Sequence, residues 1–119
     1  MFVGVMRLDF HLPGARSLKD KRMTVRSFRD RVRARFDVSI AEVEHQDLHQ
    51  RATFGVALVS SDARVCDEVL GAVASLAGSV RDALLVERRT EVMAVGELRD
   101  DLSLAPSLRP RSGGDPEES

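Results

Sequence analysis

The stretch FVGVMRLDFHLPGARSLKD, residues 2–20, holds the two local patterns that decide the fold. Even-numbered positions from 6 to 12 are apolar, whereas positions 7, 9 and 11 are polar. An alternation with a period of two predicts a half-buried strand over residues 2–12. The Pro-Gly pair at 13–14 then ends this strand. The chain therefore begins with one strand followed by a turn.

A helix is expected immediately after that turn. Ser17 and Asp20 match the S-x-x-D capping box, which predicts a helix beginning at Ser17. Five apolar residues then recur at helical spacing and form one stripe: Leu18, Val25, Phe28, Val32 and Phe36. We expect this stripe to lie against the core.

The remaining elements complete a mixed fold. Residues 37–44 and 52–60 read as strands, and the second is apolar on both faces, which indicates a central position in the sheet. Ser60, Ser61 and Asp62 are cap candidates for a second helix with its apolar stripe at Val65, Val69, Val73, Leu76 and Val80, and residues 84–95 form a fourth strand. The order β-α-β-β-α-β predicts an α+β, ferredoxin-like fold, with a four-stranded antiparallel sheet and both helices on one face.

Length and composition predict one domain and a tail. The 119 residues fit a single domain, which we expect over residues 1–97. Residues 98–119 contain three prolines without apolar periodicity, so a largely disordered C-terminal tail is expected. The single Cys66 has no partner for an intrachain disulfide and fits a packed core thiol. Because neither a secretion signal nor a membrane-spanning apolar run is visible, we expect a cytoplasmic protein without a membrane partner.

Charge is concentrated in the first predicted helix. Residues 16–35 hold nine Lys or Arg residues against two Asp, whereas residues 36–119 hold eight basic and sixteen acidic residues. Such an asymmetry bears on partners and not on fold. Five of the cations step by three or four residues and form a continuous row beside the apolar stripe: Lys19, Arg22, Arg26, Arg29 and Arg33. We call this row the basic ridge.

Two interpretations of the basic ridge stay open. Aligned guanidinium groups can clamp phosphates, which predicts a module that binds RNA or the ribosome. The same groups can instead pair with acidic neighbours such as Asp67, Glu68 or Glu91, in which case each surface pair contributes under about 1 kcal/mol and needs no further role.

The polar stretch between the second and third strands raises a third possibility. His45 and His49 flank Asp47, which suggests metal or small-ligand binding or acid–base chemistry. A strand-to-strand loop does not hold two histidines at helical spacing, however, and the sequence supplies no clear third ligand. A polar turn whose Asp and Gln side chains bond the backbone is favoured. Neither phosphate-loop motif is present, and no serine lies in a nucleophile-elbow context. Together with the missing third ligand, these observations predict no enzyme, cofactor or metal.

The open face of the predicted sheet suggests a homodimer. Val3, Val5, Thr53, Gly55 and Ala57, with Val59, share the outward parity of two strands and would form a flat patch of small, mostly apolar residues. Such a patch is a candidate interface for self-association without nucleic acid. Base stacking on this face is not expected, because Phe54 is the one aromatic residue left for it.

Two segments resemble the YlxP-like family of small bacterial proteins of unknown function. They are the S-L-K-x-K-R start of the first helix at 17–22 and the A-E-V-x-x-Q-D-L-x-Q-R-A hairpin at 41–52, and the resemblance covers about residues 1–97. It implies a ferredoxin-like fold. Genes of this family neighbour those of translation initiation and ribosome assembly factors in many bacteria, which implies association with RNA or ribosomes. The resemblance implies no catalytic residues.

Overall fold

The computed structural model describes residues 1–96 and contains six elements. In chain order they are β1 (Phe2–His11), α1 (Leu18–Arg35), β2 (Ser39–Glu44), β3 (Arg51–Ser60), α2 (Ala63–Gly78) and β4 (Leu84–Ala94). The predicted β-α-β-β-α-β order is confirmed. Residue 97 and the predicted tail at 98–119 lie outside the described residues.

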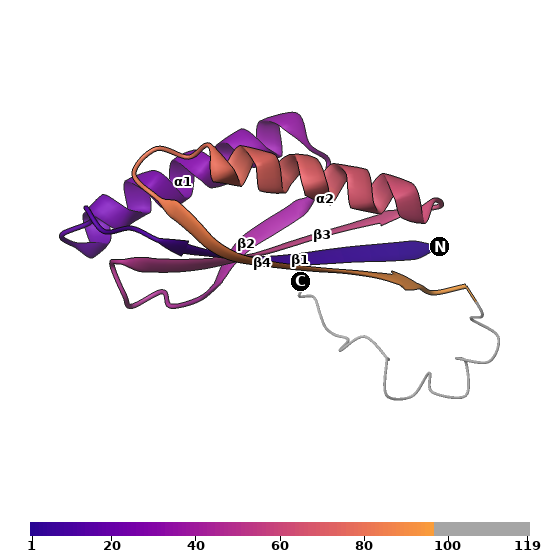
Figure 1. Ribbon diagram of the computed structural model, residues 1–119, viewed down its shortest axis with the longest axis horizontal. Helices are drawn as coiled ribbons and strands as arrows, with labels where there is room; N and C mark the ends of the chain where they lie inside the picture. Colours follow the sequence, from indigo (N-terminus) through magenta and orange to yellow (C-terminus); the bar gives the residue numbers. More distant parts are fainter. Residues whose placement is uncertain (97–119) are drawn as a thin grey trace, which may run out of the picture.

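The four strands form one antiparallel sheet in the order β2-β3-β1-β4. Figure 1 shows α1 and α2 stacked side by side on one face of this sheet. The central strands are β3 and β1; the central position of β3 was predicted from the apolar composition of residues 52–60. The ferredoxin-like arrangement is therefore confirmed, and it leaves β2 and β4 as the two edges of the sheet.

Both helices begin with side-chain caps. The Ser17 hydroxyl accepts a hydrogen bond from the backbone N–H of Asp20 at 3.1 Å. The Asp20 carboxylate accepts from the N–H of Arg16 at 2.9 Å, one residue earlier than in a regular capping box. In α2, Asp62 is the cap and accepts from the N–H of Arg64. The predicted start of α1 is confirmed.

The core lies between the sheet and the two helices. Phe10, Phe28 and Phe54 meet edge to face at its centre, with ring centroids 5.1 to 5.8 Å apart. Val25, Phe28 and Val32 of the predicted stripe of α1 are buried, and Lys21 is buried in line with them. Because Phe54 belongs to this cluster, it is not available to stack on a base.

The buried stripe of α2 departs from the prediction in the first half of the helix. Cys66 and Leu70 are buried there in place of Val65, which is 39% exposed, and Val69, which is half-buried. Val73 and Leu76 of the predicted stripe are buried, as expected. The cause is Gly4 of β1, since a Cβ at this position would come within 3.0 Å of both Cys66 and Leu70. The helix therefore approaches the sheet through Cys66, and this thiol is a core group, as predicted.

None of the helices in the described part of the chain is long and apolar enough to cross a membrane.

Candidate nucleic-acid interface

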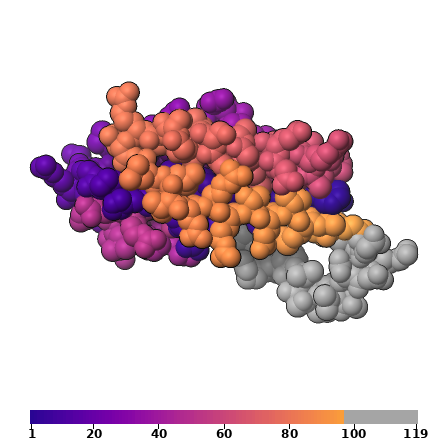
Figure 2. All heavy atoms as spheres, in the orientation of Figure 1, coloured from indigo at the N-terminus to yellow at the C-terminus, as the bar shows by residue number. Residues whose placement is uncertain are grey.

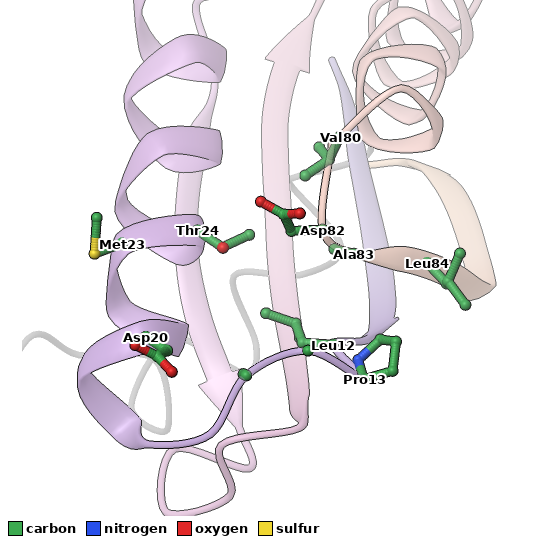
Figure 3. Close-up of a pocket in the computed structure, with 11 residues that line it drawn as sticks. Leu12, Pro13, Asp20, Met23, Thr24, Val80, Asp82, Ala83 and Leu84 are labelled. Atoms are coloured by element: carbon green, nitrogen blue, oxygen red, sulfur yellow. The ribbon is translucent and has the colours of Figure 1, made fainter.

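The basic ridge follows the β2 edge of the molecule. On the opposite flank of α1, Thr24 points toward the segment between α2 and β4 (Figure 3). On the ridge side, a guanidinium nitrogen of Arg33 donates to the carbonyl oxygen of Ile40 in β2 at 3.2 Å. The ridge therefore overhangs a free sheet edge and faces away from α2.

Most of the ridge is open to solvent. Lys19, Arg22, Arg26 and Arg33 are exposed, and Arg29 is half-buried. The nearest carboxylate to Arg29 belongs to its neighbour Asp30, at 3.8 Å, which is a weak contact. Within residues 1–96, no carboxylate lies within 4.0 Å of Lys19, Arg22 or Arg26.

The expected intramolecular partners of the ridge do not meet it. Asp67 and Glu68 belong to α2, and Glu91 belongs to β4, at the far edge of the sheet. None of these three forms an ion pair with a ridge residue in the described chain. The interpretation of the ridge as a set of internal salt bridges therefore loses its proposed partners.

A cleft lies at the start of α1, on the flank away from the ridge (Figure 3). It has a volume of about 620 Å³, and three chain segments line it, including Leu12, Thr24 and Val80. Asp20 and Asp82 are its charged members, and Asp82 has a left-handed backbone with φ of 68°. The sequence patterns did not reveal this cleft, because its walls come from segments that are distant in the chain.

The hairpin between β2 and β3 is held by the buried Lys21. Its ammonium nitrogen donates to the carbonyl oxygens of His45 at 2.6 Å and Leu48 at 2.7 Å. It also lies 2.7 Å from Glu42 Oε2, an ion-pair distance with angles unsuited to a hydrogen bond. A buried ammonium group needs such partners. The second lysine of the S-L-K-x-K-R segment is therefore a clamp between α1 and the hairpin and not part of the ridge.

His45 is held at its side chain as well. Its Nδ1 lies 2.9 Å from the hydroxyl oxygen of Thr53, and that hydroxyl donates to Asp9 at 2.5 Å. Because the single hydroxyl proton of Thr53 goes to Asp9, Nδ1 of His45 must carry the hydrogen that it shares with Thr53. The backbone of His45 is left-handed, with φ of 64°. This chain of hydrogen bonds thus fixes a strained residue in one orientation.

Arg7 completes the polar cluster on the open face of the sheet. Its guanidinium donates two hydrogen bonds to Glu44 and one to Asp9, which raises the pKa of Arg7. Burial opposes the charge on Asp9, but the hydrogen bonds from Thr53 and Arg7 outweigh it and lower the pKa of Asp9 below its usual value of 3.8. Asp9 is therefore an ionised, buried carboxylate with its partners in place.

The structure does not gather His45, Asp47 and His49 into one site. His45 turns toward Thr53, whereas Asp47 and His49 are exposed. Across residues 1–96, no group of three His, Cys, Asp or Glu side chains is close enough to hold a metal ion. Gln46 and Gln50 donate to backbone carbonyls, as expected for a polar turn.

The candidate patch on the open sheet face is smaller than its sequence suggested. Val3, Val5, Gly55 and Ala57 are half-buried, and Thr53 is fully buried beneath the hairpin and contributes no surface. Val59, at 64% exposure, is the most exposed member of the patch. Self-association through this face stays a prediction.

Comparisons with known proteins give a family. The model of the family described as "Protein of unknown function (DUF503)" matches residues 3–90. "Uncharacterized protein YlxP" from Bacillus subtilis (strain 168) is 34% identical over 89 residues, which are 75% of this chain and 97% of that protein. The resemblance found in residues 17–22 and 41–52 is thereby confirmed.

Two solved structures are similar to this chain at low identity. A C-terminal segment of the alpha subunit of aIF2 from Pyrococcus abyssi is 15% identical with a TM-score of 0.45, and the match covers 80% of this chain and 52% of that one. Rv0793 from Mycobacterium tuberculosis is 20% identical with a TM-score of 0.47, and the match covers 82% and 97% of the two chains. This chain thus spans about half of the first structure.

Proposed function

The chain belongs to the DUF503 family of proteins of unknown function, and from this premise we propose that it is a binding module that docks on RNA, ribosomal RNA included, through the basic ridge. The observation that carries the proposal is the exposure of Lys19, Arg22 and Arg26 without a carboxylate partner in residues 1–96. Free cations in a row are the electrostatic footprint of a polyanion-binding surface.

The geometry of the ridge suits a nucleic-acid backbone. The five residues cover fourteen helical steps, or about 21 Å along the axis. Arg33 is tied to β2 through the carbonyl of Ile40, and a carbonyl leaves its charge unneutralised. Because the ridge lies on a rigid helix whose start is capped by Ser17, the cations are presented at fixed spacing, which reduces the entropy lost on binding.

Recognition through this surface would read the backbone and not the bases. Phe54 is buried in the core, so the stacking mode of RNA-recognition motifs is not open to it. Phosphate contacts position a protein without specifying sequence. We therefore expect affinity to depend on salt and on the shape of the RNA more than on its sequence.

The salt dependence of RNA binding tests the proposal. If all five cations meet phosphates of a single-stranded RNA, log K falls with log salt at a slope of about −3.5. Fluorescence anisotropy of a labelled RNA across a salt series measures this slope. Absence of binding at low salt would overturn the proposal.

A pair of matched variants locates the binding surface. Arg22→Glu/Arg26→Glu reverses two exposed ridge charges and should remove most of the affinity, with a slope smaller by about 1.4. The control, Arg31→Glu/Arg35→Glu, makes the same change in net charge at exposed positions of the same helix, outside the ridge. Equal losses in both variants would indicate attraction by net charge alone and would contradict a role for the ridge.

A further inference from the structure

The outer edge of β4 is the longest unpaired strand edge in residues 1–96. β4 has 11 residues and pairs with β1 alone, and Figure 2 shows it as an orange band along the surface below α2. The other edge strand, β2, has 6 residues and is partly covered by the Arg33 side chain. A long open edge is a template for a further strand. We propose that a second copy of the chain pairs with β4, antiparallel and related by a two-fold axis at Thr90.

The charges of β4 select this register. A two-fold axis perpendicular to the sheet pairs each residue with the residue of the other copy that lies equally far from the axis in the opposite direction along the strand. The two side chains of such a pair lie on the same face of the sheet. With the axis at Thr90, Arg89 of each copy faces Glu91 of the other, and no like charges meet. An axis at Arg88, Arg89 or Glu91 would place that charged residue opposite itself. Only the axis at Thr90 gives two opposite-charge pairs without a like-charge pair, and like charges directly opposite are destabilising.

The strand geometry has the same centre. The register between β1 and β4 shifts next to Glu87, where Val86 is the extra residue of a bulge. Regular pairing therefore runs from Glu87 to Ala94, and Thr90 lies near its middle. A bulge twists a strand and ends straight pairing, so the part of β4 fit for a second copy is this regular part.

The Thr90 hydroxyl supplies an independent observation. Thr90 pairs with Met6 on β1 and so lies on the helix-facing side of the sheet. Its hydroxyl oxygen is buried and has no hydrogen-bond partner among the described residues. In the proposed register, the two Thr90 residues face each other, and a rotation of the Thr90 side chain about χ1 would let each hydroxyl donate to or accept from the other. Thr–Thr pairs of this kind stabilise neighbouring strands.

The helix layer leaves room for the second copy. Strand pairing alone buries too little for a stable dimer, which needs about 1,000 Å² in total. Gly71 and Gly78 lie seven residues apart on one flank of α2, and a Cβ on either would meet open space. Leu76, on the other flank of the same helix, is buried, so the glycine flank is an open side of α2. The α2 helices of two copies can pack closely along this flank.

Charge swapping tests the interface on the full chain. Sedimentation equilibrium should show a dimer for the wild type. Arg89→Glu should raise the dimer dissociation constant by about 10-fold or more, because it places like charges opposite each other twice. Glu91→Arg should do the same, and Arg89→Glu/Glu91→Arg should restore the wild-type value. Arg81→Glu, an exposed charge reversal outside the strand, should leave it unchanged.

Cross-linking tests the position of the axis. Thr90→Cys should form an intermolecular disulfide under mild oxidation, since directly opposite residues have Cα atoms within disulfide reach. Arg88→Cys should not, because the two copies of position 88 would lie about 13 Å apart along the strands.

Three results would each overturn the proposal. The first is a monomeric wild type, and the second is a charge-swapped double variant that does not recover the wild-type dissociation constant. The third is a dimer that survives Arg89→Glu but is lost in Val59→Glu. The last result would assign the dimer to the open sheet face.

Discussion

The ammonium nitrogen of Lys21 lies 2.6 Å from the carbonyl oxygen of His45, and this contact joins α1 to the hairpin between β2 and β3. Lys21 is 2% exposed, on the same stripe as Val25 and Phe28. A charge in this position is tolerated because two carbonyls and Glu42 surround it. The clamp holds His45 in its left-handed conformation from the backbone side, while Thr53 holds the ring.

Lys21→Met should destabilise the protein by about 2–3 kcal/mol. The substitution keeps the apolar stem but leaves the carbonyls of His45 and Leu48, and the carboxylate of Glu42, without their buried partner. Urea unfolding followed by circular dichroism measures the loss. Amide hydrogen exchange in residues 45–50 should accelerate at the same time.

Lys19→Met is the matched control for this loss. It makes the same substitution two residues earlier, at an exposed position, and should change the free energy of unfolding by less than about 0.5 kcal/mol. Equal changes in the free energy of unfolding of the two variants would mean that the contacts of the Lys21 ammonium group do not stabilise the protein.

Thr53→Val should cost about 1–3 kcal/mol although it preserves shape. The valine removes the hydroxyl between His45 and Asp9 and leaves Asp9 Oδ1 without that partner. In the wild type, nitrogen-15 NMR should find the neutral ring of His45 protonated at Nδ1, and in the variant this preference should be lost. An unchanged tautomer in Thr53→Val would show that Thr53 does not orient the ring.

Gly4→Val should destabilise the protein by about 1–3 kcal/mol or more through overpacking. A Cβ at Gly4 would lie 3.0 Å from the Cβ of Cys66 and from a methyl carbon of Leu70. The Cβ of Cys66 is fixed by the helix backbone and cannot move away by a change of rotamer. Cys66 thiol labelling under native conditions should become faster in the variant as α2 lifts from β1. Gly14→Val, where a Cβ meets open space, is the control and should label at the wild-type rate.

Local patterns were sufficient for the order of elements but not for their packing. The alternation in residues 2–12 and the cap at Ser17 depend on neighbours in the sequence, so both could be predicted. The phase of α2 could not, because Gly4 on a distant strand decides it. The burial of Lys21 could have been predicted, since residues 21, 25, 28 and 32 are spaced by four, three and four and so lie on one face of the helix. Its hydrogen-bond partners could not, because they are carbonyls more than twenty residues away.

In the candidate site as well, features set by local spacing could be predicted and features set by distant contacts could not. The ridge follows from helical spacing alone, and its exposure at Lys19, Arg22 and Arg26 agrees with that spacing. Thr53 was assigned to a surface by strand parity, which gives the face of the sheet but not what covers it. The hairpin folds over Thr53 because Lys21 bonds the carbonyl of His45 and the Thr53 hydroxyl, itself bonded to Asp9, meets the His45 ring. Lys21 and Asp9 are both distant from the hairpin in sequence.

The acid stability of the protein should contain a component from Asp9. Its folded pKa lies below the ordinary value of 3.8, so the unfolded chain binds the proton more readily than the folded one. The stabilisation by Asp9 is therefore fully present above about pH 5 and is lost as the pH falls below 3.8 through the folded pKa. Asp9→Asn should accordingly be less stable than the wild type at neutral pH, and the difference should shrink in acid. Urea unfolding of both proteins over a pH series measures this difference.

Asp62→Asn is the control for this prediction. The pKa of Asp62 is also lowered, by its hydrogen bonds with Arg64, but Asp62 lies at an exposed helix cap. Solvent screening there makes the effect on stability small. A gap between wild type and Asp9→Asn that stays constant down to about pH 2 would mean that the ionised carboxylate is not what Thr53 and Arg7 stabilise.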